Sequence, residues 1–122
     1  MSPIRQHLGK RGENLAEQEL RRQGMAILER NYRTREGEVD LIARDGDFLV
    51  FVEVRTRREG NQGSPEESVT LAKKARLIAL AEAYVAQAEW KGPWRIDVVG
   101  IHLGPRGELE GINWIPNAVE GG

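Results

Sequence analysis

Two charged residues in one apolar segment, and a third shortly before it, are the residues of this sequence best suited to chemistry. The segment Phe48–Thr56 is rich in Phe, Leu and Val, which is typical of a central strand, yet it contains Glu53 and Arg55. Side chains alternate along a strand, so these two share one face. Charges in a buried strand are costly unless they are paired or bind an ion. Asp40, on the strand-like segment Val39–Ala43, is the candidate partner.

The turn between the two segments decides whether their carboxylates meet. Asp45-Gly46 is typical of a two-residue hairpin loop of type I′, which needs residues that tolerate positive φ. With that loop Asp40 lies opposite Phe51, and Glu38 lies opposite Glu53. Asp40 and Glu53 are then diagonal neighbours on one face, roughly 6–8 Å apart between backbones. A three-residue loop would place them on opposite faces.

Two carboxylates at that spacing can hold one divalent cation between their oxygens. Oxygen ligands without His or Cys favour Mg²⁺ or Mn²⁺ over zinc, and the chain contains no cysteine. A cluster of Glu38, Asp40 and Glu53 without a cation would repel itself. The alternative is an ion-paired strand in which Arg55 neutralises Glu53 or Glu38. Spacing alone leaves both interpretations open.

The remaining elements follow from periodicity and turn signals. Apolar residues at a helical period predict a helix over residues 4–23 that ends at Gly24. A second helix runs to about Glu89, with its N-cap at either Ser64 or Thr70. We expect an irregular extended segment over residues 25–34, a polar loop over 57–64, and strands over Trp94–Leu103 and Glu108–Ile115. This order predicts an α/β domain with a mixed sheet.

Length and composition set the frame for this domain. A chain of 122 residues with 39% apolar and 30% charged residues fits one globular domain. We expect that domain over residues 1–117, followed by a frayed tail over residues 118–122. No apolar run approaches the roughly 18 residues that span a bilayer, and the N-terminus lacks the apolar core of a signal peptide. These features predict a cytoplasmic protein without a membrane segment.

The net charge of −1 gives no overall electrostatic case for nucleic acid. The basic residues nevertheless cluster, with eight Lys or Arg against four Glu in the first 35 residues. Two further groups lie at Arg55, Arg57 and Arg58 and at Lys73, Lys74 and Arg76. Local basic patches on a neutral protein can bind a polyanion, although any one of them can also be a solvated face.

Several motifs together resemble the YraN family of small bacterial proteins, over nearly the whole chain. They are Gly9-Lys10-Arg11-Gly12-Glu13, Arg30-Asn31-Tyr32-Arg33, Gly37-Glu38-Val39-Asp40-Leu41-Ile42-Ala43, Phe51-Val52-Glu53-Val54-Arg55, Gly63-Ser64-Pro65-Glu66 and Arg95-Ile96-Asp97-Val98-Val99. That family resembles the PD-(D/E)xK nucleases and, among them, the archaeal Holliday-junction resolvases. The resemblance implies a restriction-endonuclease-like core, in which a mixed central sheet is flanked by helices.

The resemblance also implies roles for individual residues. Asp40 and Glu53 match the two acidic positions that hold Mg²⁺ or Mn²⁺, and Glu13 matches a helix glutamate that completes the cluster. Arg55 takes the position usually held by lysine. Because arginine stays protonated, Arg55 can contact phosphate and stabilise charge but is a poor general base. Glu38 would order the water or a second metal.

Three functions follow from this resemblance. The first is a Mg²⁺-dependent endonuclease acting on DNA, including branched or damaged DNA, in which Arg57, Arg58, Lys73 and Arg76 contact phosphates beside the site. The second is a non-catalytic nucleic-acid-binding protein on the same fold, which the arginine at position 55 favours. The third is a partner-binding protein that keeps only the fold. Resolvase-like proteins act as dimers because a four-way junction has two symmetric cleavage points, so the resemblance extends to a homodimer.

Overall fold

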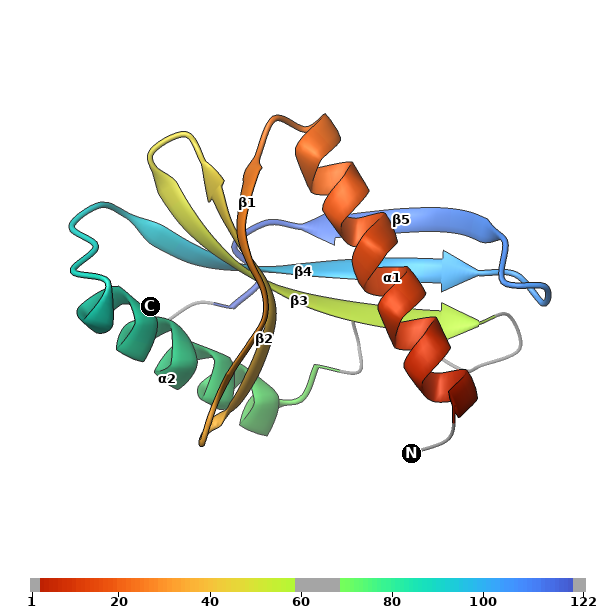
Figure 1. Ribbon diagram of the computed structural model, residues 1–122, viewed down its shortest axis with the longest axis horizontal. Helices are drawn as coiled ribbons and strands as arrows, with labels where there is room; N and C mark the ends of the chain where they lie inside the picture. Colours follow the sequence, from red (N-terminus) through yellow and green to blue (C-terminus); the bar gives the residue numbers. More distant parts are fainter. Residues whose placement is uncertain (1–2, 59–68, 120–122) are drawn as a thin grey trace.

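One mixed sheet and two helices make up the part of the chain that the structure describes (Figure 1). The computed structural model describes residues 3–58 and 69–119. The strands lie in the order β1-β2-β3-β4-β5. Only β3 and β4 are parallel, and the other neighbours are antiparallel. The predicted α/β class with a mixed sheet and flanking helices is confirmed. The elements are α1 (Pro3–Arg22), β1 (Ala26–Thr34), β2 (Gly37–Asp45), β3 (Phe48–Arg58), α2 (Leu71–Gln87), β4 (Trp94–Leu103) and β5 (Leu109–Ile115).

Each face of the sheet is covered by one helix. Phe51 packs with Leu80 of α2, whereas its neighbour Val52 packs with Leu20 of α1. Side chains alternate along a strand, so the two helices lie on opposite faces and β3 is buried from both sides. Figure 1 shows α1 crossing the sheet over β3 and β4. This double burial explains why the sequence of β3 is almost continuously apolar.

The helix boundaries follow local sequence signals. The Thr70 side chain accepts a hydrogen bond from the backbone N–H of Lys73 at 3.2 Å, which makes Thr70 the N-cap of α2. The alternative cap at Ser64 lies outside the described residues. Gly24 has a φ of 95° just after α1, as expected for the predicted helix stop. The predicted loop over 57–64 begins too early, because Arg57 and Arg58 still belong to β3.

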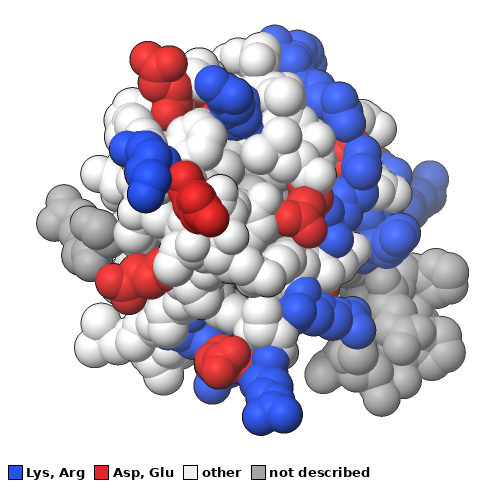
Figure 2. All heavy atoms as spheres, turned by 60° about the vertical axis from the view of Figure 1, so that its left-hand side comes forward, with Lys and Arg blue, Asp and Glu red and all other residues white. Residues whose placement is uncertain are grey.

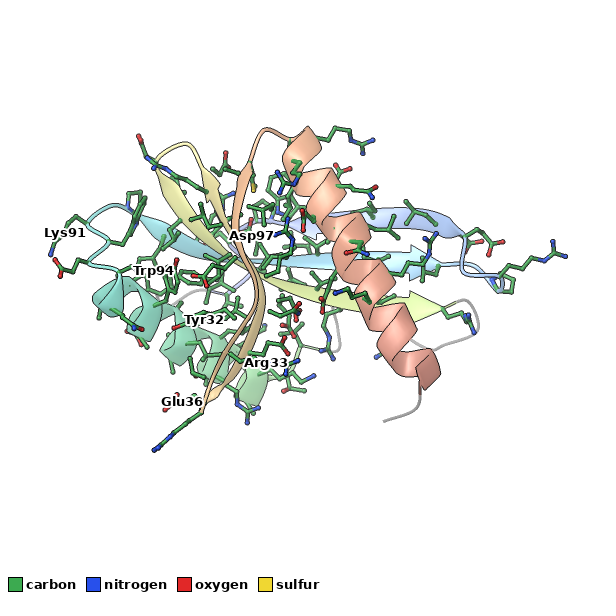
Figure 3. All side chains as sticks on the ribbon, viewed as in Figure 1. Tyr32, Arg33, Glu36, Lys91, Trp94 and Asp97 are labelled. Atoms are coloured by element: carbon green, nitrogen blue, oxygen red, sulfur yellow. The ribbon has the colours of Figure 1, made fainter. Side chains whose placement is uncertain are left out.

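A buried aspartate connects β4 with β5 and with the residues that follow β5 through hydrogen bonds. Asp97 of β4 is fully buried, and its carboxylate accepts hydrogen bonds from Arg95 Nε at 3.0 Å, Trp114 Nε1 at 2.9 Å and the Asn117 backbone N–H at 2.8 Å. Figure 3 labels Asp97 near the middle of the molecule. Arg95 also donates to Asp45 at 2.9 Å. Asp97 therefore has the structural partners that its place in an apolar strand requires.

The chain remains packed beyond the boundary predicted at residue 117. The Ala118 backbone N–H donates to the Ile96 carbonyl at 2.8 Å, and the Val119 side chain is only 4% exposed within the core on the α2 side. The prediction of a frayed tail from residue 118 is therefore wrong for these two residues, because Val119 fills an apolar site. Within the described residues, neither helix is long and apolar enough to cross a membrane.

Candidate metal centre

The loop that joins β2 and β3 differs from the predicted one. Asp45 pairs with Phe48 as the last residues of the two strands, which leaves Gly46 and Asp47 as the loop. Gly46 has a φ of 58°, whereas Asp47 is not among the described residues with positive φ. A glycine in the first loop position is typical of a type II′ turn, so the predicted type I′ turn at Asp45-Gly46 is wrong. The ion pair between Asp45 and Arg95 helps to hold Asp45 in the strand.

The altered loop changes which residues of β2 and β3 lie opposite each other, but it does not change the side of the sheet to which the paired residues point. Ile42, and not Asp40, lies opposite Phe51, so the register is shifted by an even number of residues. An even shift keeps every side chain on its predicted face. If the same register is continued, Asp40 lies directly opposite Glu53 instead of diagonal to it. The hydrogen-bonded pairing itself ends one residue before this position, at Leu41 and Val52.

At this point β2 separates from β3. Backbone pairing between the two strands ends at Leu41 and Val52. One residue further on, the side chain of Asp40 takes the place of the backbone: the Val54 N–H donates to Asp40 Oδ2 at 2.7 Å. Beyond it, β2 continues with β1 as far as Gly37, and β3 continues with β4 as far as Arg58. The two carboxylates thus lie where the sheet divides.

The environment of Asp40 disfavours its charged form. Burial raises the pKa of the Asp40 carboxyl to about 8, with further contributions from the negative charges of Glu53 and Glu13. The hydrogen bond from the Val54 N–H acts in the opposite direction but does not cancel them. Asp40 also shares a side-chain hydrogen bond with Glu53. Without a cation beside it, the Asp40 carboxyl is therefore protonated at neutral pH.

This repulsion makes the stability of the metal-free protein depend on pH. The pKa of Asp40 is higher in the folded than in the unfolded state, so its penalty is absent below about pH 4 and grows as the pH rises towards 8. We expect Asp40→Asn to stabilise the protein by about 2 kcal/mol at pH 9 and to have little effect at pH 4. Urea unfolding in EDTA at both pH values measures this difference. Asp47→Asn, an exposed change in the hairpin loop, is the control and should show no such gain.

Glu53 and Arg55 share one face, as predicted, and form an ion pair. Arg55 Nη1 lies 3.2 Å from Glu53 Oε2, and Glu53 is only 9% exposed. The ion pair of the alternative interpretation is therefore present between Arg55 and Glu53. It does not exclude a second role for Glu53, because a carboxylate has two oxygens that can accept several bonds.

Glu38 lies beside this pair but is not opposite Glu53 in the strand pairing, because β2 has already left β3. Its Oε1 atom is 3.4 Å from Arg33 Nε. That ion pair lacks hydrogen-bond geometry, and Oε1 is buried without any hydrogen-bond partner in the described part of the chain. A buried carboxylate oxygen in this state calls for a further partner.

A small cavity of about 110 Å³ connects these acids with cations of α2. Glu38 and Glu53 line it from the strands, and Lys73 and Arg76 line it from the helix. Helix and hairpin approach closely here, since a Cβ on Gly37 would lie 2.9 Å from Arg76 Cδ. The structure therefore brings two of the four predicted phosphate contacts to the carboxylates.

The other two predicted phosphate contacts lie elsewhere on β3. Arg57 is half-buried and Arg58 is exposed, and neither lines the cavity. Figure 2 shows Lys and Arg side chains gathered along one side of the face that it presents, with acidic side chains among them. On this face of the molecule the basic side chains therefore lie among acids and do not form a uniform positive surface.

Helix α1 packs closely against β3 at a glycine, next to the glutamate that it contributes to the site. Gly12 is buried against β3, where an added Cβ would overlap Thr56 Oγ1 and lie 3.2 Å from Thr56 Cβ. The next residue, Glu13, accepts a hydrogen bond from Asn31 Nδ2 at 3.0 Å. Asn31 was not predicted as a site residue. An asparagine inside a strand, where left-handed backbone is rare except for Gly, Asn and Asp, is the signal that would have indicated it.

The close approach at Gly12 gives a direct test of the packing of α1. We expect Gly12→Ala to lower the free energy of unfolding by about 1–3 kcal/mol, because Thr56 and the helix must move apart. Gly9→Ala, in the same helix with nothing within 4 Å of the added Cβ, should instead raise it by about 0.5–1 kcal/mol. Urea denaturation of both variants measures the contrast. Equal effects at the two positions would contradict the close packing.

The donor set fits a hard divalent cation. It consists of carboxylate oxygens, and it includes Glu38 Oε1, which is buried without a hydrogen bond among the described residues, and Asp40, whose charged form is disfavoured by burial and by Glu53. Over residues 3–58 and 69–119, no three His, Cys, Asp or Glu side chains form a group ready to hold a metal ion. The described geometry therefore offers the pair of Asp40 and Glu53 as the nucleus of a site.

Comparisons with known proteins agree on the family. The model of "Uncharacterised protein family UPF0102" matches residues 12–101. A UPF0102 protein of Roseiflexus castenholzii is 50% identical over 122 residues, covering 98% of each chain. One from Dictyoglomus turgidum is 43% identical, covering 91% of this chain and 95% of its own. One from Symbiobacterium thermophilum is 48% identical, covering 84% and 87%. The chain therefore belongs to the uncharacterised protein family UPF0102, which is the YraN family that its motifs resemble.

Proposed function

We propose that this protein is a divalent-metal-dependent endonuclease that hydrolyses phosphodiester bonds in DNA. Branched DNA and intermediates of repair or recombination are the proposed substrates. The observation that carries the proposal is the pairing of two half-buried to buried carboxylates, Asp40 and Glu53, where β2 divides from β3. Such a pair is costly in a protein without an ion to share, and it occupies the positions that the PD-(D/E)xK resemblance assigns to the metal ligands.

In this proposal Asp40 and Glu53 bind Mg²⁺ or Mn²⁺, and Glu13 completes the acidic set from α1. The ion would supply Lewis-acid polarisation of the scissile phosphate and activation of water. Asp40 would lose its proton on binding, since the positive charge of the cation stabilises the carboxylate against the burial and the neighbouring acids that raise its pKa. The hydrogen bond from the Val54 N–H holds Asp40 Oδ2 in place, and the cation would replace the hydrogen bond that Asp40 shares with Glu53.

The cations around the cavity bind the substrate. Lys73 and Arg76 line the same cavity as Glu53, and in this proposal they contact phosphate oxygens. Arg55 stabilises negative charge on the phosphate without acting as a base, because its guanidinium stays protonated. Glu38 would accept a hydrogen bond from the attacking water through Oε1, which has no hydrogen-bond partner among the described residues. Arg57 and Arg58 extend the contacts along the DNA backbone.

The second candidate function is nucleic-acid binding without cleavage. The ion pair of Arg55 with Glu53 favours it, since that pair neutralises part of the charge that a cation would need. In this case the same cations hold the phosphate backbone and no bond is broken. Both functions use the same surface, and they differ only in whether the bound DNA is cleaved.

The assembly and the place of action follow from the substrate. A four-way junction presents two symmetric scissile positions, which two copies of the chain related by a twofold axis would match. We therefore propose a homodimer on DNA. Such a substrate would place the activity in the bacterial cytoplasm.

Cleavage assays on single-stranded, flapped and four-way DNA test the proposal, each with Mg²⁺, with Mn²⁺ and with EDTA. The expected result is product in one or both metals and none in EDTA. Retarded migration of DNA without product in either metal would select the non-catalytic function. Absence of any DNA affinity at low salt would overturn both, because phosphate contacts are strongest there.

A further inference from the structure

Asn31 has an unusual backbone conformation for its place in the fold. It lies inside β1 with a φ of 51°. Among the described residues that are not glycine, positive φ otherwise occurs at Glu89 and Asn117, which follow α2 and β5 at chain reversals. A left-handed residue within a strand interrupts regular pairing, and such residues persist where the surroundings impose them, often at functional sites.

The strand register places Asn31 beside the candidate metal centre. Arg30 pairs with Leu41 and Tyr32 pairs with Val39, so Asn31 and Asp40 lie opposite each other across β1 and β2. The neighbouring Tyr32 is anchored against α2, with its ring 5.2 Å from that of Tyr84 (Figure 3). The backbone on that side of Asn31 is therefore fixed by packing.

The side chain of Asn31 connects β1 to α1. Its Nδ2 donates to Glu13 Oε1 at 3.0 Å in a partly buried position. Glu13 in turn is close enough to Asp40 for its charge to act on that carboxyl. Asn31 thus contacts the helix glutamate from the strand position that lies between the pairs flanking Asp40.

We propose that Asn31 is the positioning residue of the site: it holds the Glu13 carboxylate at the edge of the Asp40 and Glu53 pair, so that three elements contribute to binding one divalent cation. This inference rests on the proposed function. The neutral amide suits the task, because it orients a carboxylate without adding a charge that would compete with the cation. Hydrogen-bond partners that orient ligands typically change metal affinity by about 10–100-fold.

The variant Asn31→Gly tests the contribution of the side chain while keeping the backbone conformation. Glycine adopts φ of 51° without strain, so folding is retained while the amide is lost. Asn117→Gly is a matched control, since Asn117 has the same φ of 51° but follows β5, away from the site. The readouts are the Mn²⁺ dissociation constant from calorimetry and the urea midpoint of the metal-free protein. We expect about tenfold weaker Mn²⁺ binding for Asn31→Gly, no change for Asn117→Gly, and nearly unchanged urea midpoints for both.

The double variant Glu13→Gln with Asn31→Gly tests whether Asn31 acts through Glu13. The expected result is an Mn²⁺ affinity no weaker than that of Glu13→Gln alone, because the effects of coupled residues are not additive. Additive losses, or wild-type affinity in Asn31→Gly, would overturn this inference and leave the proposed function intact. Failure of the wild-type protein to bind either Mg²⁺ or Mn²⁺ would overturn the proposed function and this inference together.

Discussion

Glu53→Gln is expected to lower the rate of metal-dependent DNA cleavage by at least about 10²-fold, and Asp40→Asn by a similar factor. The reason is that outer hydrogen-bond partners of a metal alone account for about 10–100-fold, so loss of a direct ligand costs more. Both substitutions keep the shape of the side chain. Asn at position 40 still offers an oxygen to the Val54 N–H, so the division between β2 and β3 is preserved. Single-turnover cleavage of a labelled four-way junction measures the rate.

The cleavage rates of the single and double variants show whether Asp40 and Glu53 act at one site or contribute independently. The double variant should cleave no more slowly than the slower single variant, since residues that hold one ion act as a unit. Glu82→Gln, which removes an exposed glutamate from α2, is the control and should retain the wild-type rate. Cleavage at the wild-type rate in Glu53→Gln and Asp40→Asn would show that the metal centre lies elsewhere.

Asp97→Ala is expected to lower the free energy of unfolding by about 3–5 kcal/mol. The substitution removes a fully buried acceptor and leaves three donors unpaired, on Arg95, Trp114 and the backbone of Asn117. Of these, the Arg95 side chain is only 13% exposed and carries a charge, so its desolvation is no longer balanced. Urea denaturation followed by circular dichroism measures the loss.

A matched change on the other acid of Arg95 supplies the control. Asp45 also pairs with Arg95, at 2.9 Å, but its side chain is 40% exposed. Asp45→Ala should therefore cost no more than about 1 kcal/mol, as for other exposed ion pairs. A loss below about 1 kcal/mol for Asp97→Ala as well would contradict the structural role of its hydrogen bonds. Asp97 also has no place among the proposed ligands, so its folded variants should bind Mn²⁺ as the wild type does.

The sequence predicted the structure best where a whole segment is buried. The apolar run around Glu53 predicted a central strand, and that strand is buried by a helix on each face. The shared face of Glu53 and Arg55 follows from strand alternation and is confirmed by their ion pair. The hairpin was predicted with the wrong loop residues. Its error was an even number of positions, so the prediction that Asp40 and Glu53 share a face survived.

The features that the sequence did not predict depend on contacts between distant segments. Asp45 belongs to the strand and not to the loop, and its ion pair with Arg95 of β4 is invisible in the local turn signal. The separation of β2 from β3 needs the Asp40 carboxylate to replace a backbone acceptor. Val119 is buried because a pocket on the α2 side of the sheet receives it. The asparagine at position 31 was a sequence signal for a left-handed residue, but its contact with Glu13 depends on the packing of α1 against the sheet.

The hydrogen bond from Val54 to Asp40 also means that the Val54 backbone N–H responds to the charge state of Asp40. A backbone proton shared with a carboxylate responds to the charge on that carboxylate, both in its resonance position and in its exchange with solvent. The Val54 amide therefore reports whether Asp40 carries a proton, a negative charge or a bound ion. A single nitrogen-15 resonance, followed through a titration with acid or with Mg²⁺, would read the state of the centre without DNA and without turnover.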